Sequence, residues 1–248
     1  MSKPCGSPGL HFSIDDVLEC LLELDGSQES LYEHWFFAFL RQLHFDFDIS
    51  IDLYLFYRRQ VGRGDKDLSC VSDRFIADFA SSPWLRFGYH ALDYITPPYQ
   101  QTVAEQLASF SLIEKEIIRF TGRGASSPLL RLHYFSETYE IYDFLAGHGV
   151  HGLLLTDKQA VAYHLPDTHR MRLERYGHTH YRGLDLYRTH ARVENLHRDG
   201  RSNEDIRRYF ELCMRRHEYI TLFTHETELR DLAMRDKLRQ CLEIMKSL

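Results

Sequence analysis

The feature that most constrains the fold is an alternation of short apolar segments with longer amphipathic ones. Runs rich in β-branched, aromatic and leucine residues predict buried strands over 10–14, 49–57, 84–90, 129–135, 151–156 and 219–224. Apolar residues at helical spacing predict helices over 27–43, 100–120, 136–149, 202–217 and 226–248. Strands that alternate with helices are typical of parallel sheets joined by crossover helices, so we expect an α/β fold.

The length and composition favour a single domain. The chain has 248 residues, of which 44% are hydrophobic, and this is enough for a sizeable core. We find no internal repeat, low-complexity segment or Pro/Gly-rich linker, so residues 1–248 are predicted to form one domain. The stretch over about 157–200 is rich in His, Arg and Tyr and lacks a strong helical face. It is predicted to be an irregular insertion or a hairpin near the site.

Charge and hydropathy exclude several classes of function. The net charge is −6 and no uninterrupted basic run occurs, which argues against nucleic acid as the main partner. No segment has the pattern of a signal peptide, and none has the roughly 18 consecutive apolar residues of a membrane span. We therefore expect a soluble, cytoplasmic protein without membrane insertion.

The five cysteines show no C-x-x-C pairing and are predicted to be reduced thiols. The sequence leaves the oligomeric state open.

Polar residues capable of acid, base or metal-ligand chemistry lie at the ends of five predicted strands. They are Asp15 and Asp16, His90, His133 with Tyr134, Asp157, and His225. In an α/β barrel the carboxyl ends of the strands open onto one face, so these residues are predicted to form one site. The alternative is that polar residues border strands in any soluble protein.

The predicted site has the composition of a divalent metal centre. Aspartate and histidine with open positions for water are typical zinc ligands, and cobalt, nickel or iron would also suit them. One member of the Asp15–Asp16 pair would bind the ion while the other stays free as a general base, and the cation would relieve their repulsion. The alternative for this pair is an acidic first turn of a helix. A second metal site at His178 and His180 is a weaker hypothesis.

The order of these motifs resembles the polysaccharide deacetylase (NodB-homology) family. The matching segments are FSIDD, FGYH, RLHY, LLLTD and LFTHE, and they extend from about Phe12 to Glu226. Members of this family hydrolyse N- or O-acetyl groups of sugars with a metal held on a distorted (β/α)7 barrel. The resemblance implies that fold here. A closer resemblance is to the small intracellular deacetylases of bacterial surface-polysaccharide (O-antigen) assembly, typified by WbmS.

The resemblance implies most of a metal site, with one departure. Asp15 is similar to the family's catalytic base, and Asp16 and His90 are similar to two of its metal ligands. The position of the second ligand histidine is occupied by Tyr94, and a phenol with a pKa of about 10 is a poor zinc ligand at neutral pH. His133 stands where the family has proline, at the end of a neighbouring predicted strand. We predict that His133 is the third ligand; the alternative is that it lines the sugar pocket or bonds to backbone.

The remaining motifs imply the other catalytic roles. His225 is similar to the family's general acid. Arg131 is similar to the arginine that orients the base, and Asp157 to the aspartate that pairs with that arginine. Together Arg131 and Asp157 are expected to hold the base and the acid in place. Tyr134, whose neighbouring backbone would hold the oxyanion, and Tyr94 are predicted to contact the substrate.

These expectations define a metal-dependent hydrolase that removes an acetyl group from an N-acetylated sugar. The sugar would be a free or carrier-linked precursor in surface-polysaccharide biosynthesis. The alternative is a catalytically silent barrel that binds a sugar or carbohydrate precursor, because the histidine expected at position 94 is missing.

Overall fold

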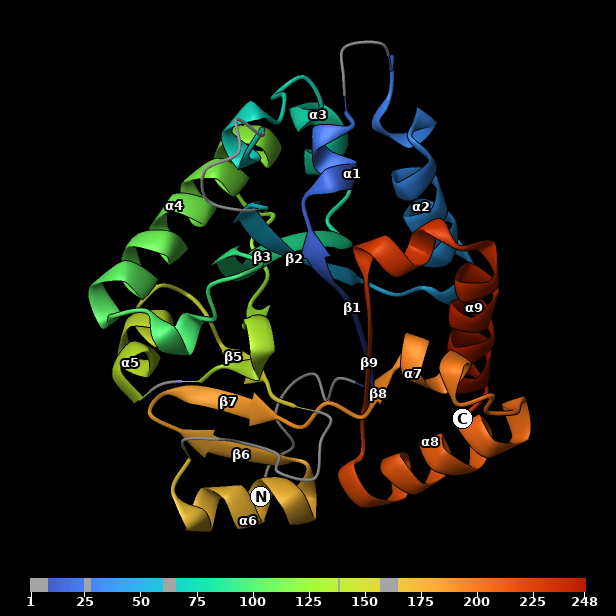
Figure 1. The fold of residues 1–248 in the computed structure, drawn as a ribbon. Helices are drawn as coiled ribbons and strands as arrows, with labels where there is room; N and C mark the ends of the chain where they lie inside the picture. Colours follow the sequence, from blue (N-terminus) through green and yellow to red (C-terminus); the bar gives the residue numbers. More distant parts are fainter. Residues whose placement is uncertain (1–8, 25–27, 60–65, 138, 157–164) are drawn as a thin grey trace.

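The computed structural model describes residues 9–24, 28–59, 66–137, 139–156 and 165–248, and it confirms an α/β fold (Figure 1). Among these residues, one sheet has five strands, all parallel to their neighbours. Its order is β3 (Leu85–Asp93), β2 (Ile51–Arg58), β1 (Leu10–Val17), β9 (Ile220–His225) and β8 (Ala191–Arg192). Segments from both ends of the chain therefore lie side by side in the centre of this sheet.

A second sheet of four strands continues the arrangement. Its order is β4 (Leu129–Leu130), β5 (Gly152–Leu154), β7 (Leu184–Tyr187) and β6 (His178–Tyr181), and only β6 is antiparallel to its neighbour. The Phe87 N–H donates to the Ala125 carbonyl at 2.8 Å and the Ser127 N–H donates to the Phe87 carbonyl at 2.7 Å, which joins β3 to the segment before β4. No strand pairing joins β7 to β8 in the described chain. The arrangement is that of a (β/α) fold, but a single closed barrel is not seen.

Helices cover the outer faces of the strands (Figure 1). They are α1 (Glu19–Leu22), α2 (Trp35–Phe47), α3 (Ile76–Ala80), α4 (Val103–Thr121), α5 (Tyr139–Gly147), α6 (Asp167–Tyr176), α7 (Val193–Arg198), α8 (Asn203–His217) and α9 (Leu232–Lys246). Thr102 and Ser202 begin α4 and α8 with capping boxes, which satisfy N–H groups that a helix cannot satisfy itself. No described helix is long and apolar enough to cross a membrane.

Three predicted elements differ from the structure by more than a few residues. The strand expected over 129–135 ends at Leu130, and His133–Phe135 form a 3-10 turn, η4. Tyr134 and Phe135 have φ angles of 56° and 53°, and residues in the left-handed region cannot continue a strand. The helices expected over 27–43 and 226–248 begin later, at Trp35 and Leu232, because short 3-10 turns precede both.

Part of the stretch over 157–200 forms a hairpin, which was one of the two predicted alternatives, and the rest of its described residues are more regular than the predicted irregular insertion. Residues 157–164 lie outside the described residues, but the remainder forms α6, the β6–β7 hairpin, β8 and α7. Strand β7 pairs with β5, and β8 pairs with β9. Strands of two to four residues are too short to show a periodic pattern, so only pairing within the fold reveals them.

Candidate functional site

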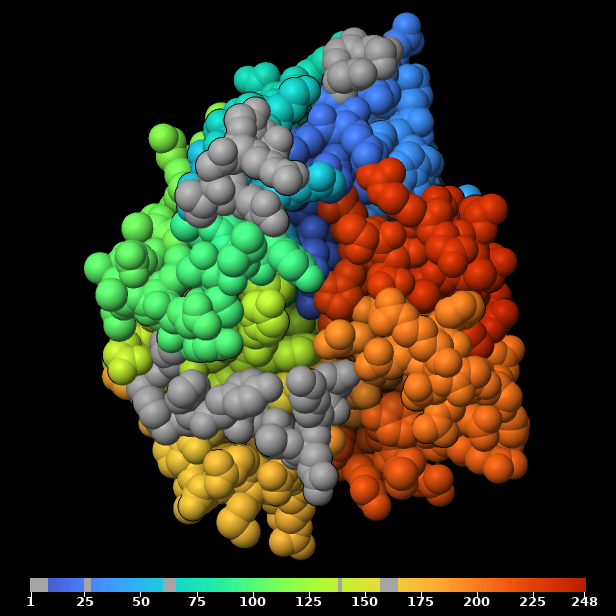
Figure 2. Space-filling view, in the orientation of Figure 1, coloured from blue at the N-terminus to red at the C-terminus, as the bar shows by residue number. Residues whose placement is uncertain are grey.

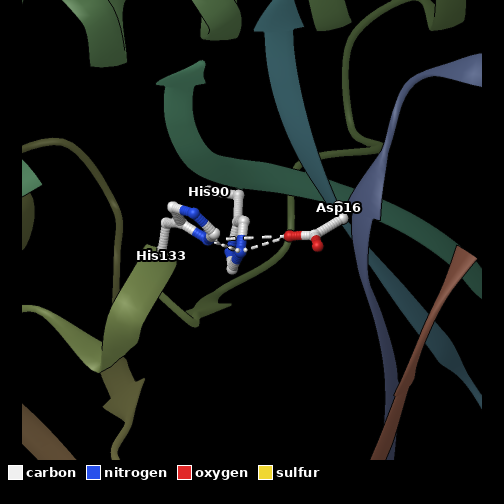
Figure 3. Close-up of side chains that lie close together, drawn as sticks. All are labelled: Asp16, His90 and His133. Carbon is white, nitrogen blue, oxygen red and sulfur yellow. Dashed lines mark hydrogen bonds and ion pairs between the residues drawn. The ribbon is translucent and has the colours of Figure 1, made fainter. Parts of the chain in front are cut away.

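The three predicted ligand residues lie together. Asp16 comes from β1, His90 from β3 and His133 from η4, and their side chains point toward one another (Figure 3). One ligand atom of each lies within 4.8 Å of the other two, and no other described His/Cys/Asp/Glu group has this geometry. The Asp16 Oδ1 is 3.1 Å from the His90 Nε2 and 3.6 Å from the His133 Nδ1. We call these residues the Asp/His/His triad.

A backbone irregularity explains how two adjacent aspartates serve one site. Successive side chains of a regular strand point to opposite faces, so Asp15 and Asp16 would normally diverge. Asp16 has a φ of 61°, and the pairing of β1 with β2 shifts register between Ile14 and Val17. This bulge re-aims the side chain, so Asp15 and Asp16 line the same cavity.

Hydrogen bonds fix which nitrogen of each triad histidine faces inward. The His90 Nδ1 lies 2.6 Å from the Arg131 carbonyl oxygen, and the His133 Nε2 lies 3.2 Å from the Tyr94 carbonyl oxygen. A carbonyl only accepts, so these outer nitrogens carry the protons. The inner nitrogens, 3.1 Å apart, then present lone pairs to each other and to the Asp16 carboxylate. Such an arrangement is typical of metal-binding histidines, whose second nitrogen is held by the protein.

The charge states of the triad also suit a cation. Burial lowers the pKa of His133 to about 4, with a further contribution from His90, so its imidazole is neutral at pH 7. Burial raises the carboxyl pKa of Asp16, but the imidazoles around it, His90 first and then His225 and His133, outweigh burial and hold the pKa below its usual value. A carboxylate and a neutral imidazole are the forms that bind metals.

Asp15 lies beside the triad and is paired with a buried arginine. The Arg131 Nη1 donates to the Asp15 Oδ1 at 3.0 Å and to the Ser13 Oγ at 2.6 Å, and its Nη2 donates to the Thr189 Oγ1 at 3.3 Å. Arg131 is fully buried, and its guanidinium lies 4.2 Å from the centre of the Phe223 ring. These contacts fix the position of the Asp15 carboxylate and place the positive charge of Arg131 next to it.

His225 completes the group of titratable residues. It pairs with Asp15 in the register of β1 and β9, and its Nε2 is 4.0 Å from the Asp16 Oδ2. Its Nδ1 is hydrogen bonded to the Glu194 carboxylate, which also accepts from the Thr224 Oγ1 at 3.0 Å. Burial lowers the pKa of His225, but Glu194 and the two aspartates outweigh it, so the pKa lies above its usual value.

Glu194 is the site residue that sequence reasoning missed. Asp157, which was expected to help hold the acid and the base, lies outside the described residues, and it is Glu194 that contacts His225. Glu194 follows the carboxyl end of β8 by two residues, so it obeys the same strand-end pattern as the other candidates. That signal was hidden because β8 has only two residues.

The group opens into a cavity of about 1300 Å³. Tyr94, Tyr99 and Tyr134 line it and are 55%, 51% and 48% exposed. On the face that Figure 2 shows, atoms from the N-terminal part of the chain, drawn in dark blue, lie between the green and the red-orange segments.

The predicted second metal site has a simpler arrangement. His178 and His180 lie on β6, and both imidazoles contact the same Asp185 oxygen, at 3.2 and 2.9 Å. All three side chains are at least 40% exposed, and the group does not share the compact geometry of the triad. We describe it as a surface hydrogen-bond cluster.

Comparisons with known proteins show a similarity of fold. The sequence matches no family model and no curated protein. The crystal structure of 4-alpha-glucanotransferase from Thermococcus litoralis is similar to this chain, with a TM-score of 0.58 and 12% sequence identity. The match covers 97% of this chain and 38% of that chain, so the chain spans well under half the length of this neighbour. At this identity the similarity concerns the (β/α) fold.

Proposed function

We propose that this protein is a metal-dependent hydrolase that removes the acetyl group from an N-acetylated sugar, a precursor in surface-polysaccharide assembly. The observation that carries the proposal is the convergence of three units in one cavity. They are the Asp/His/His triad, the Asp15–Arg131 pair and the His225–Glu194 pair. Amide hydrolysis needs an activated water, a stabilised oxyanion and a proton for the leaving nitrogen, and these units can supply them.

The triad would hold a divalent ion, with zinc as the first choice. Its donor set of one carboxylate oxygen and two unprotonated imidazole nitrogens fits zinc, and cobalt, nickel or iron are compatible with it. Three protein ligands leave positions open for water and substrate. When bound, the ion would polarise the acetyl carbonyl and lower the pKa of water to about 7.

Asp15 would act as the general base. It lines the cavity next to Asp16, and its Oδ1 accepts a hydrogen bond from the Arg131 Nη1. Its carboxylate accepts the proton of the attacking water, and Arg131 limits its rotation. The oxyanion would lie against the backbone near Tyr134, whose φ of 56° turns the chain at the cavity wall.

His225 would act as the general acid. Its raised pKa keeps a larger fraction of the imidazole protonated near neutral pH. The Nδ1–H is hydrogen bonded to Glu194, so the Nε2–H is the proton available to the leaving nitrogen. The Glu194 carboxylate stabilises the imidazolium before transfer. The proton taken by Asp15 and the proton given by His225 together balance the hydrolysis.

The cavity is compatible with a sugar that bears a further group. Its volume exceeds what a single acetylated sugar ring needs, and the rings of Tyr94, Tyr99 and Tyr134 at its edge can stack on the apolar face of a pyranose. We therefore favour a carrier-linked substrate over a free monosaccharide.

The direct test is acetate release by the purified, zinc-loaded protein from a panel of N-acetylated sugars, both free and nucleotide-linked. We expect acetate release that requires zinc and that is lost in Asp15→Asn. Zinc-loaded protein that binds these sugars and releases no acetate would instead indicate a catalytically silent sugar-binding barrel.

A further inference from the structure

A buried carboxylate outside the cavity is bonded to the backbone just after Asp16. Glu226 is the first residue of η5 (Glu226–Arg230), directly after β9, and is 0% exposed. Its two carboxylate oxygens accept three consecutive backbone N–H groups. The donors are Leu18 at 2.8 Å, Glu19 at 3.1 Å, and Cys20.

These three N–H groups belong to the start of α1, a helix that has no cap of its own. It has four residues, and the residue at its N-cap position, Leu18, offers no side-chain acceptor. The first N–H groups of a helix have no partner inside it, and a single turn is not stable alone. Glu226, which is 208 positions away from Leu18 in sequence, satisfies them and places a negative charge at the positive end of the helix.

The same contact limits the conformation of Asp16. The backbone before Asp16 is held by the pairing of Asp15 with His225, and the backbone after it is held by the pairing of Val17 with Leu55 and by Glu226 at Leu18. Between these restraints Asp16 adopts a φ of 61°, which is unfavourable for a residue with a side chain. Such conformations persist only where the surrounding structure over-determines them.

We propose that Glu226 is a positioning residue of the metal site: by fixing Leu18–Cys20 it holds the Asp16 carboxylate toward His90 and His133. This inference rests on the proposed function, because it takes the triad to bind a metal. Glu226 is not among the residues that line the cavity, so it acts through Asp16 and does not touch the substrate. It also joins the end of the strand that carries His225 to the segment that directly follows β1 and its Asp16.

The test is zinc affinity, measured by competition with a chromophoric chelator, for the parent and for Glu226→Gln and Glu226→Ala. Glutamine keeps the size of the side chain but only one acceptor oxygen, so its amide group would face an N–H donor. We expect Glu226→Gln to weaken zinc binding by about tenfold or more, the usual range for losing a group that orients a ligand, and Glu226→Ala to weaken it further. Glu116→Gln is the matched control, because Glu116 is also buried and forms its ion pair with Arg119 on α4.

A second variant and a double-mutant cycle separate positioning from general destabilisation. Glu19→Pro removes one of the three donors, and proline is tolerated at the first helical position, so it should also weaken zinc binding. In an Asp16→Ala background, Glu226→Gln should cause no further loss, because its effect passes through Asp16.

The outcomes are distinguishable. If the parent and Glu226→Gln bind zinc equally well, the positioning inference is overturned. It is also overturned if Glu226→Gln lowers the zinc affinity of the Asp16→Ala variant by the same factor as it lowers that of the parent. If the parent itself binds no divalent metal, both this inference and the proposed function are overturned.

Discussion

The His133 Nδ1 lies 3.1 Å from the His90 Nε2, and the other nitrogen of each ring is held by a backbone carbonyl. Two unprotonated nitrogens at this distance repel each other unless a cation lies between them. Both rings also pack against Phe56, with centroids 4.9 and 5.2 Å from its ring, which restricts their rotation. The two imidazoles are therefore arranged to donate their lone pairs to a metal ion.

The first prediction concerns His133. Replacing His133 with Ala should lower zinc affinity by at least about tenfold and lower activity in parallel, because one of three ligands is lost. Elemental analysis should give one zinc per parent chain. His178→Ala on the β6–β7 hairpin is the control and should keep the parental zinc affinity and activity. Adding Tyr94→His to His133→Ala should restore part of the affinity, whereas a His133→Ala protein with parental zinc affinity would remove His133 from the ligand set.

The second prediction concerns Asp15. Asp15→Asn should keep zinc and lower kcat by at least ~10²-fold, the low end for loss of a general base. The fold should persist because the Asn oxygen can still accept from Arg131. Steady-state kinetics with zinc content measured on the same sample would check it. Near-parental turnover in Asp15→Asn, with complete loss in Asp16→Asn, would show that the two roles are wrongly assigned.

The third prediction concerns pH dependence. Because the pKa of His225 is raised, the protonated acid persists to higher pH, and kcat/KM should fall only as the pH passes this pKa. Glu194→Gln removes the strongest contact that raises the pKa, so the alkaline limb should shift to lower pH. His225→Ala should lose that limb altogether. Rate profiles of the three proteins measured on one substrate would decide, and an unshifted limb in Glu194→Gln would exclude coupling of Glu194 to the acid.

The fourth prediction concerns stability. Arg131 and Asp15 are both buried, so Arg131→Met would leave a buried carboxylate without its partner. Breaking such a pair costs about 3–5 kcal/mol of unfolding free energy. Denaturant unfolding should show this loss, while Arg170→Met, which breaks an exposed pair with Asp167 on α6, should change stability by about 1 kcal/mol or less. Equal effects of the two substitutions would contradict the burial argument.

The amino-acid pattern alone predicted the fold class and the longer elements, and it named most of the residues that the structure brings together in the candidate site. The strands around Phe12, Leu53 and Phe223 are apolar runs that can only be buried, and the helices capped at Thr102 and Ser202 begin at residues whose side chains accept N–H groups. Because parallel strands bring their carboxyl ends together, residues at strand ends could be assigned to one site before any contact was known. His133 was one of these strand-end candidates, and its role as the third ligand, which follows from Tyr94 at the position of the family's histidine, stays a prediction.

The contacts that depend on long-range pairing could not be predicted from the sequence and became visible in the folded chain. Strand β8 has two residues and exists because it pairs with β9, and it is this pairing that brings Glu194 to His225. The left-handed φ of Asp16 and the capping of α1 by the Glu226 carboxylate likewise depend on contacts between residues that are far apart in the sequence. A local pattern reports which residues prefer to be buried or helical. It carries no information about which distant donor satisfies a given acceptor, and the geometry of this site depends on those pairings.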